Sequence, residues 1–135
     1  MSLYVNCTHT TVASRYMNKN QRPLFFTPFQ RHELRNAIRL GVYRKDYTSL
    51  QKEEILDCLQ EDCRTGVLKN TVVPWGEVFR ESERISKAYT ETIGNRGADL
   101  FHVAIALVLD SKEFLTFDKK QGELARSTGL SVPFI

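Results

Sequence analysis

The sequence predicts an α/β fold with a mainly parallel sheet and helices on both faces. Short apolar runs rich in aromatic or β-branched residues alternate with longer segments whose apolar residues recur at helical spacing. This alternation is typical of parallel sheets, because each strand needs a crossover before the next can begin. The 135 residues, of which 41% are hydrophobic, are enough for a single domain with its own core.

Local signals place each element along the chain. Thr27 and Pro28 form an N-cap and a first-turn proline, Ser49 is a second candidate cap, and Gly129 is placed to end a helix. The expected helices cover residues 8–17, a segment from 28, 49–66, 75–94, 98–109 and 121–128, and the expected strands cover 24–26, 71–73, 113–117 and 130–132.

Composition excludes several classes of protein. No apolar run reaches the roughly 18 residues of a membrane span, and the first residues lack the pattern of a signal peptide. Cys7, Cys58 and Cys63 are odd in number and lack C-x-x-C spacing, which argues against a disulfide framework and a zinc site. We therefore expect a reducing, cytoplasmic setting. The net charge of +3 tolerates an anionic partner without requiring one.

Three acids follow the points where predicted strands end: Glu33, Asp99 and Asp118. Clustered carboxylates without a nucleophile or a Cys/His ligand set suggest a site that holds Mg²⁺ or Mn²⁺ over a phosphate. Each acid also has a structural interpretation, because acids favour the first turn of a helix and aspartate favours turns.

Chain geometry favours grouping these acids. Asp99 opens a helix about 16 Å long. The following strand, 113–117, returns by about 16 Å, so Asp118 comes back level with Asp99. Glu33 begins a helix directly after the strand at 24–26. In a parallel sheet all three acids would lie at one edge, where α/β proteins bind ligands.

Two segments resemble the PIN-domain family. The run GNRGADLFHVAIALVLDSKEFLTFDKKQGELARSTGLSV is similar to the family's carboxyl half, and TPFQRHELRNAIRL resembles its second acidic motif. The resemblance implies a three-layer, Rossmann-like fold over residues 1–135 and an acidic pocket for Mg²⁺ or Mn²⁺. It also implies metal-dependent hydrolysis of RNA phosphodiesters. Many small bacterial members are VapC-type toxins that form homodimers and are held by an antitoxin.

The same resemblance implies a role for individual residues. Glu33, Asp99 and Asp118 match the second, third and fourth acids of the pocket. Thr116 matches the residue that supports the last acid, and Arg96 matches a basic position beside the third acid, with a surface ion pair as its alternative interpretation.

The chain departs from the family pattern at its beginning. PIN domains start with a strand that ends in an aspartate, and two interpretations remain open. Either this strand is missing from the sequence, which we favour, or Leu3–Val5 is a vestigial strand and Asn6 replaces the acid. An asparagine would hold a divalent ion less well. We therefore expect weak or absent activity, and exposed strand edges that favour dimerisation.

Two rival functions differ from a nuclease. One is a non-catalytic PIN-like module that binds RNA or a protein, and the other is a receiver-type regulatory domain, which would need paired acids at its first strand. Basic residues near Glu33 either line an RNA path or form a solvated helix face. These basic residues are Arg31, Arg35, Arg39, Arg44 and Lys45.

Overall fold

The computed structural model describes Tyr4 and residues 9–135. It is 66% helix and 6% strand, with one small parallel sheet of two strands. The predicted three-layer α/β fold with a mainly parallel sheet is therefore wrong. The chain divides into two compact units, Met1–Val72 and Val73–Ile135, called unit 1 and unit 2 below. The predicted strand at Leu3–Val5 and its Asn6 fall outside the described residues, apart from Tyr4.

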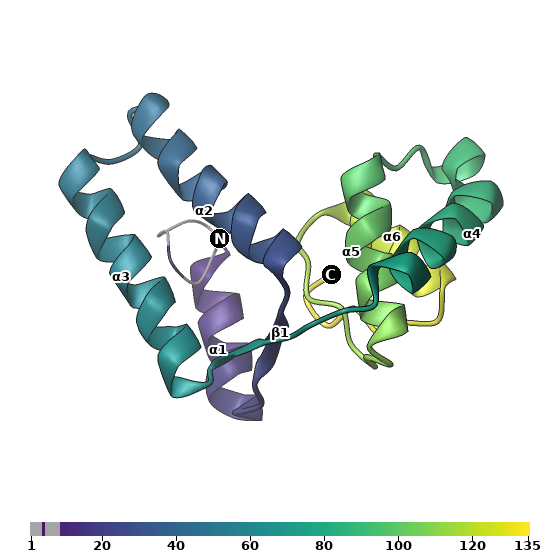
Figure 1. Cartoon of the computed structure of the whole chain (residues 1–135), viewed down its shortest axis with the longest axis horizontal. Helices are drawn as coiled ribbons and strands as arrows, with labels where there is room; N and C mark the ends of the chain where they lie inside the picture. The colour runs from purple at the N-terminus through teal and green to yellow at the C-terminus, as the bar shows by residue number, and fades with distance from the viewer. Residues whose placement is uncertain (1–3, 5–8) are drawn as a thin grey trace. The chain divides into compact units, whose positions relative to one another are not determined.

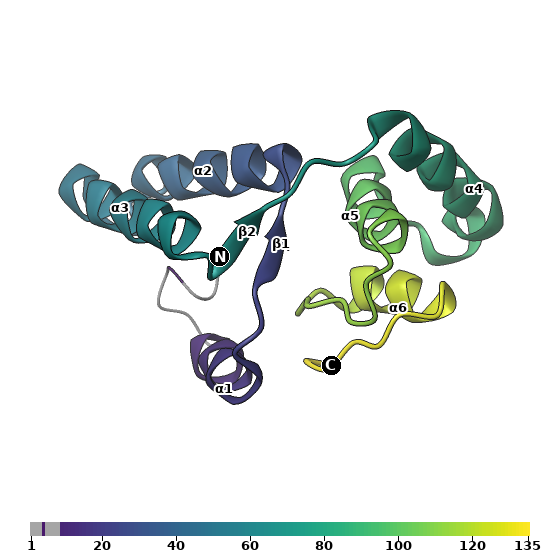
Figure 2. The same cartoon turned by 60° about the horizontal axis from the view of Figure 1, so that its bottom comes forward.

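Unit 1 is a helical hairpin packed on a two-stranded sheet. Its elements are α1 (Thr10–Asn20), β1 (Leu24–Phe26), α2 (Pro28–Tyr43), α3 (Ser49–Thr65) and β2 (Leu68–Asn70). The two strands are parallel, with Leu24 opposite Leu68 and Phe26 opposite Asn70. α2 and α3 lie side by side, and the strands run together at one end of this pair (Figures 1 and 2).

Two capping boxes begin α2 and α3. The Thr27 amide donates to Gln30 Oε1 at 2.9 Å, and Gln30 N donates to Thr27 Oγ1 at 3.3 Å. Thr48 and Gln51 repeat this exchange at 2.8 and 3.2 Å. The predicted Thr27 cap is confirmed, and α3 is capped one residue before the expected start. α3 ends as predicted at Gly66, whose φ of 84° is the left-handed conformation that glycine adopts without a steric penalty.

The core of unit 1 lies between α2, α3 and the sheet. Phe26, Ile38, Leu59 and Leu68 are almost fully buried there. Tyr4 packs against this cluster, and its hydroxyl donates to Asp62 Oδ2 at 2.6 Å. Burial, together with this hydrogen bond, raises the pKa of the Tyr4 phenol.

Unit 2 is a three-helix arrangement of α4 (Trp75–Ile93), α5 (Gly97–Val108) and α6 (Lys119–Ser127). α5 is the most apolar helix and packs against both α4 and α6 (Figure 2). The centre of unit 2 is formed by completely buried side chains from all three helices: Val78, Ile85, Val103 and Leu124. All three helices were predicted from the sequence, including the stop at Gly94.

Three predicted strands are wrong. The run at 71–73 has no strand pairing, and Val72 there is 92% exposed. The strand forms earlier, at β2. The segments 113–117 and 130–132 share one parallel bridge, Glu113 with Ser131, with Phe114 N donating to Ser131 O at 2.8 Å. One bridge does not make a pair of strands, because parallel strands are held by hydrogen bonds repeated along their length.

None of the described helices combines the length and the apolar character that crossing a membrane requires.

We predict that Ile38→Ala lowers the free energy of unfolding by about 2–5 kcal/mol, because it leaves a cavity in a fully buried site. Leu50→Ala is the control, since Leu50 is 73% exposed and its truncation should cost no more than about 0.5 kcal/mol. Urea unfolding measures both values. Equal small losses would contradict the assigned core.

We predict that Tyr4 stabilises the fold at neutral pH and that this contribution declines above about pH 10, the pKa of an unperturbed phenol. The sign follows because the folded state retains the phenol proton that the unfolded state releases. Urea unfolding at pH 8 and pH 11 should show a greater loss for the wild type than for Tyr4→Phe. Identical pH dependence in the two proteins would refute this role.

Candidate functional site

Asp99 caps the start of α5. Its Oδ2 accepts a hydrogen bond from the Arg96 backbone amide at 3.1 Å. Asp99 is the third residue of the helix and is partly buried. A carboxylate here satisfies a donor that has no partner within the helix, and it interacts favourably with the helix dipole.

Asp118 caps the start of α6 in a similar way. Its Oδ1 accepts from the Gln121 amide at 2.9 Å, and its own amide donates to Thr116 Oγ1 at 3.1 Å. The Thr116 side chain is buried, and its hydroxyl donates to Gln121 Oε1 at 2.6 Å. Thr116 therefore contacts the backbone amide of Asp118, and the supporting role that the resemblance implies for Thr116 stays a prediction.

Gln121 joins the two acids. Its side-chain Nε2 donates to Asp99 Oδ1 at 3.2 Å, while its backbone amide holds Asp118. Asp99, Thr116, Asp118 and Gln121 thus form one hydrogen-bonded group, called the acid junction below. Asp118 and Asp99 are thus linked through Gln121, but the strand over 113–117 that was expected to bring Asp118 to a sheet edge is not formed. Gln121 was missed from the sequence, although a glutamine three residues after an N-cap is a recognisable capping signal.

Asn95 lies beside the acid junction. It precedes the α5 cap residue Arg96, and its Nδ2 donates to the carbonyl of Lys120 in the first turn of α6 at 3.1 Å. Asn95 is only 7% exposed, yet its Oδ1 has no hydrogen-bond partner among the described residues. A buried amide oxygen without a hydrogen-bond partner lowers stability. A bound cation or hydrogen-bond donor that contacts Asn95 Oδ1 would reduce this loss.

The local electrostatics favour negative charge at the junction. The N-terminal ends of α5 and α6 both carry unsatisfied amide groups and the positive end of a helix dipole. Asp99 and Asp118 complement these two ends, and Asp118 is exposed to solvent. The structural task of each acid is therefore clear. Each oxygen of a carboxylate has a second lone pair, so capping leaves capacity for a further ligand.

The other predicted site residues have different positions. Glu33 is the sixth residue of α2 and belongs to unit 1, and the exposed Arg96 contributes its backbone amide to the junction. The described residues contain no group of three or more Asp, Glu, His or Cys side chains arranged to hold a metal ion. The place of Glu33 among the ligands stays a sequence prediction.

The donor set at the junction is compatible with Mg²⁺ or Mn²⁺. These ions take oxygen ligands, and Mg²⁺ is commonly held by one or two carboxylates while it keeps several waters. Asp99 and Asp118 supply the carboxylates, and Asn95 Oδ1 is an unpaired oxygen at the same helix junction. These are ligand types that Mg²⁺ accepts, while the two helix N-termini already draw on the charge of Asp99 and Asp118.

Comparison with known proteins adds no family assignment. No family model matches the chain, and no curated protein matches it.

We predict that Gln121→Ala lowers the free energy of unfolding by about 1–3 kcal/mol, because it leaves the buried Thr116 hydroxyl without its acceptor. Glu123→Ala, on the exposed side of the same helix, should change the value by no more than about 0.5 kcal/mol. Denaturant unfolding of both variants tests the difference. Equal effects would show that the side-chain contacts of Gln121 add nothing to stability.

Proposed function

We propose that this protein hydrolyses RNA phosphodiesters with the help of Mg²⁺ or Mn²⁺, the activity implied by its resemblance to PIN-domain ribonucleases of the VapC type. The observation that carries the proposal is the acid junction. Two aspartates 19 residues apart in the sequence share one glutamine at the start of two helices. Both aspartates belong to the motifs on which the resemblance rests.

Each residue has a defined task in this proposal. A bound Mg²⁺ would lower the pKa of an attacking water and offset charge on the scissile phosphate. Asp99 and Asp118 would hold the ion, while Gln121 and Thr116 keep the two carboxylates in place. Pre-positioned ligands matter because supporting hydrogen bonds set the orientation of a metal-binding carboxylate. No nucleophilic side chain is required.

The partners follow from the same resemblance, and the setting follows from the cysteines. We propose an RNA substrate, a cognate antitoxin and a homodimer, and a reducing cytoplasm in which the free thiols of Cys58 and Cys63 persist. Activity should be weak, because the family's first acid has no counterpart in the recognised motifs.

We predict that a ribonuclease assay with Mn²⁺ gives slow cleavage that falls at least about tenfold in Asp99→Asn and in Asp118→Asn. Asparagine at position 118 keeps the cap of α6 and removes the charge, so Asp118→Asn separates charge from fold. At position 99 both carboxylate oxygens accept hydrogen bonds, so Asp99→Asn removes the charge together with one of these contacts. Glu33→Gln tests Glu33, the remaining predicted acid, in the same way.

Asp110→Asn is the matched control. Asp110 is an exposed acid that pairs with Lys112, and its φ of 52° is a conformation that asparagine tolerates. This variant should cleave like the wild type. Calorimetry should show millimolar or tighter Mn²⁺ binding that is lost in Asp99→Asn. No Mn²⁺ binding, together with no cleavage, would replace the enzyme by a non-catalytic module that binds RNA or a protein.

A further inference from the structure

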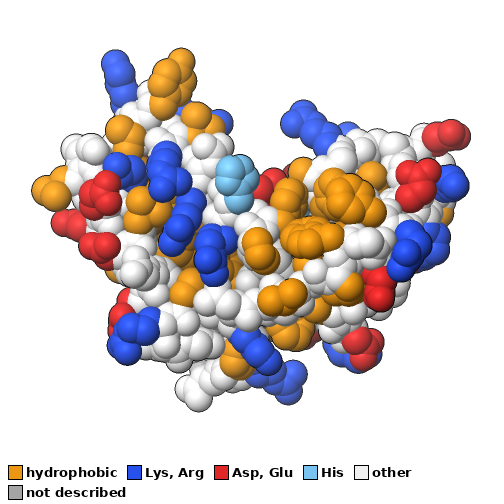
Figure 3. Space-filling model, in the orientation of Figure 1, with side chains coloured by type: hydrophobic (Ala, Val, Ile, Leu, Met, Phe, Trp, Pro, Cys, Tyr) orange, Lys and Arg blue, Asp and Glu red, His pale blue; other side chains and the backbone are white. Residues whose placement is uncertain are grey.

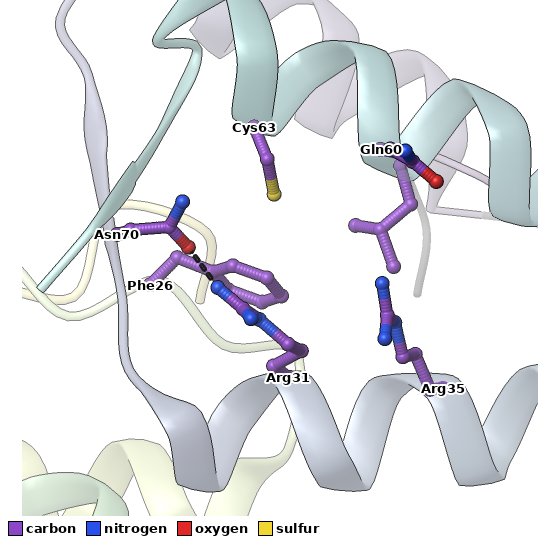
Figure 4. Close-up of a pocket in the computed structure, with 7 residues that line it drawn as sticks. Phe26, Arg31, Arg35, Gln60, Cys63 and Asn70 are labelled. Carbon is purple, nitrogen blue, oxygen red and sulfur yellow. Dashed lines mark hydrogen bonds between the residues drawn. The ribbon is translucent and has the colours of Figure 1, made fainter.

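Unit 1 contains a hollow with a volume of about 230 Å³ between α2, α3 and the sheet. Seven residues line it: Phe26, Arg31, Arg35, Leu59, Gln60, Cys63 and Asn70. Arg31 and Arg35 project from α2 into this space, and Cys63 points back toward them from α3 (Figure 4). All of these residues belong to unit 1, so the hollow is separate from the acid junction of unit 2.

The lining is rich in hydrogen-bond donors and contains no carboxylate. Arg31 donates to Asn70 Oδ1, and its guanidinium lies 6.0 Å from the centre of the Phe26 ring. These contacts orient Arg31 and occupy the oxygen of Asn70, which leaves the amide NH₂ of Asn70 as a donor. The hollow therefore presents two guanidinium groups and an amide donor, a set that matches the oxygens of an anion.

Arg35 has no hydrogen bond or ion pair with any residue that the structure describes. It lies four residues after Arg31 on the same helix, a spacing at which like charges repel each other. The first turn of α2 contains no acidic residue. Lys and Arg side chains gather over α2 on this unit, whereas α3 carries more acidic than basic residues (Figure 3). An anion in the hollow would relieve the repulsion.

We propose that this hollow binds a phosphate group carried by a nucleotide. Two arginines one helical turn apart suit a phosphate, because planar guanidinium groups bind phosphate oxygens through paired hydrogen bonds. Leu59 and Cys63 add apolar contacts beside these donors. The phosphate is either the terminal group of a free nucleotide or a linkage within RNA. Both sources offer phosphate oxygens to Arg31 and Arg35, but the terminal group has more free oxygens and the larger negative charge.

The test is titration calorimetry of the full chain with uridine monophosphate, uridine and the dinucleotide UpU, all in EDTA. EDTA removes divalent ions, so a failure of the proposed nuclease activity leaves this result unaffected. Uridine monophosphate or UpU should bind at least about tenfold more tightly than uridine, since the phosphate provides the charge-assisted contacts. Tighter binding of the monophosphate identifies a terminal phosphate, and comparable binding of UpU identifies the RNA backbone.

Arg35→Gln is the main variant, because no hydrogen bond or ion pair between described residues depends on the Arg35 side chain. It should weaken phosphate binding about tenfold. Arg39→Gln is the matched control, since it removes the same charge from an exposed position of α2 outside the hollow. Equal weakening in both variants, or equal affinity for uridine and its phosphate, would overturn the proposal. Preferential binding of the blocked peptide Ac-Glu-Glu-NH₂ would also overturn it, in favour of an acidic protein partner.

Discussion

Side-chain hydrogen bonds at helix starts hold α2 and α3 in unit 1 and α5 and α6 in unit 2, whereas α1 and α4 begin without such a cap. The first amide groups of a helix have no partner within it, and most of this chain is helical. Thr27 and Thr48 supply the partners in unit 1, and Asp99 and Asp118 supply them in unit 2. The acids proposed for metal binding are therefore also parts of the scaffold, held in place by the hydrogen bonds that begin the helices.

This double use explains the form of the acid junction. A carboxylate that caps a helix is fixed in direction, and Gln121 fixes two of them at once. Fixed ligands lose little freedom when they bind an ion, which favours binding even with few carboxylates. Because asparagine at position 118 retains the cap and removes the charge, the scaffold and the chemistry can be separated there by experiment.

The two units carry opposite local chemistry. The hollow of unit 1 offers donors from Arg31, Arg35 and Asn70 and has no carboxylate in its lining. The acid junction of unit 2 offers oxygens from Asp99 and Asp118. The proposed metal-dependent cleavage of RNA would use both kinds of surface, one for backbone phosphates and one for a divalent ion. The residues of each surface belong to one unit, so the binding of an anion and of a divalent ion can be measured separately.

The sequence by itself determined the helices and their ends, because caps, glycines and apolar periodicity act over a few neighbouring residues. Thr27, Gly66 and Gly94 mark helix ends where the sequence placed them. The acids Asp99 and Asp118 were also recognised from their positions, but not the glutamine that joins them. Only the tertiary structure decided the strands, because a strand exists through partners far along the chain. The segment 113–117 makes a single bridge, at Glu113. The strand that pairs with β1 is β2, and the β-branched run at 71–73 lies after it in the sequence.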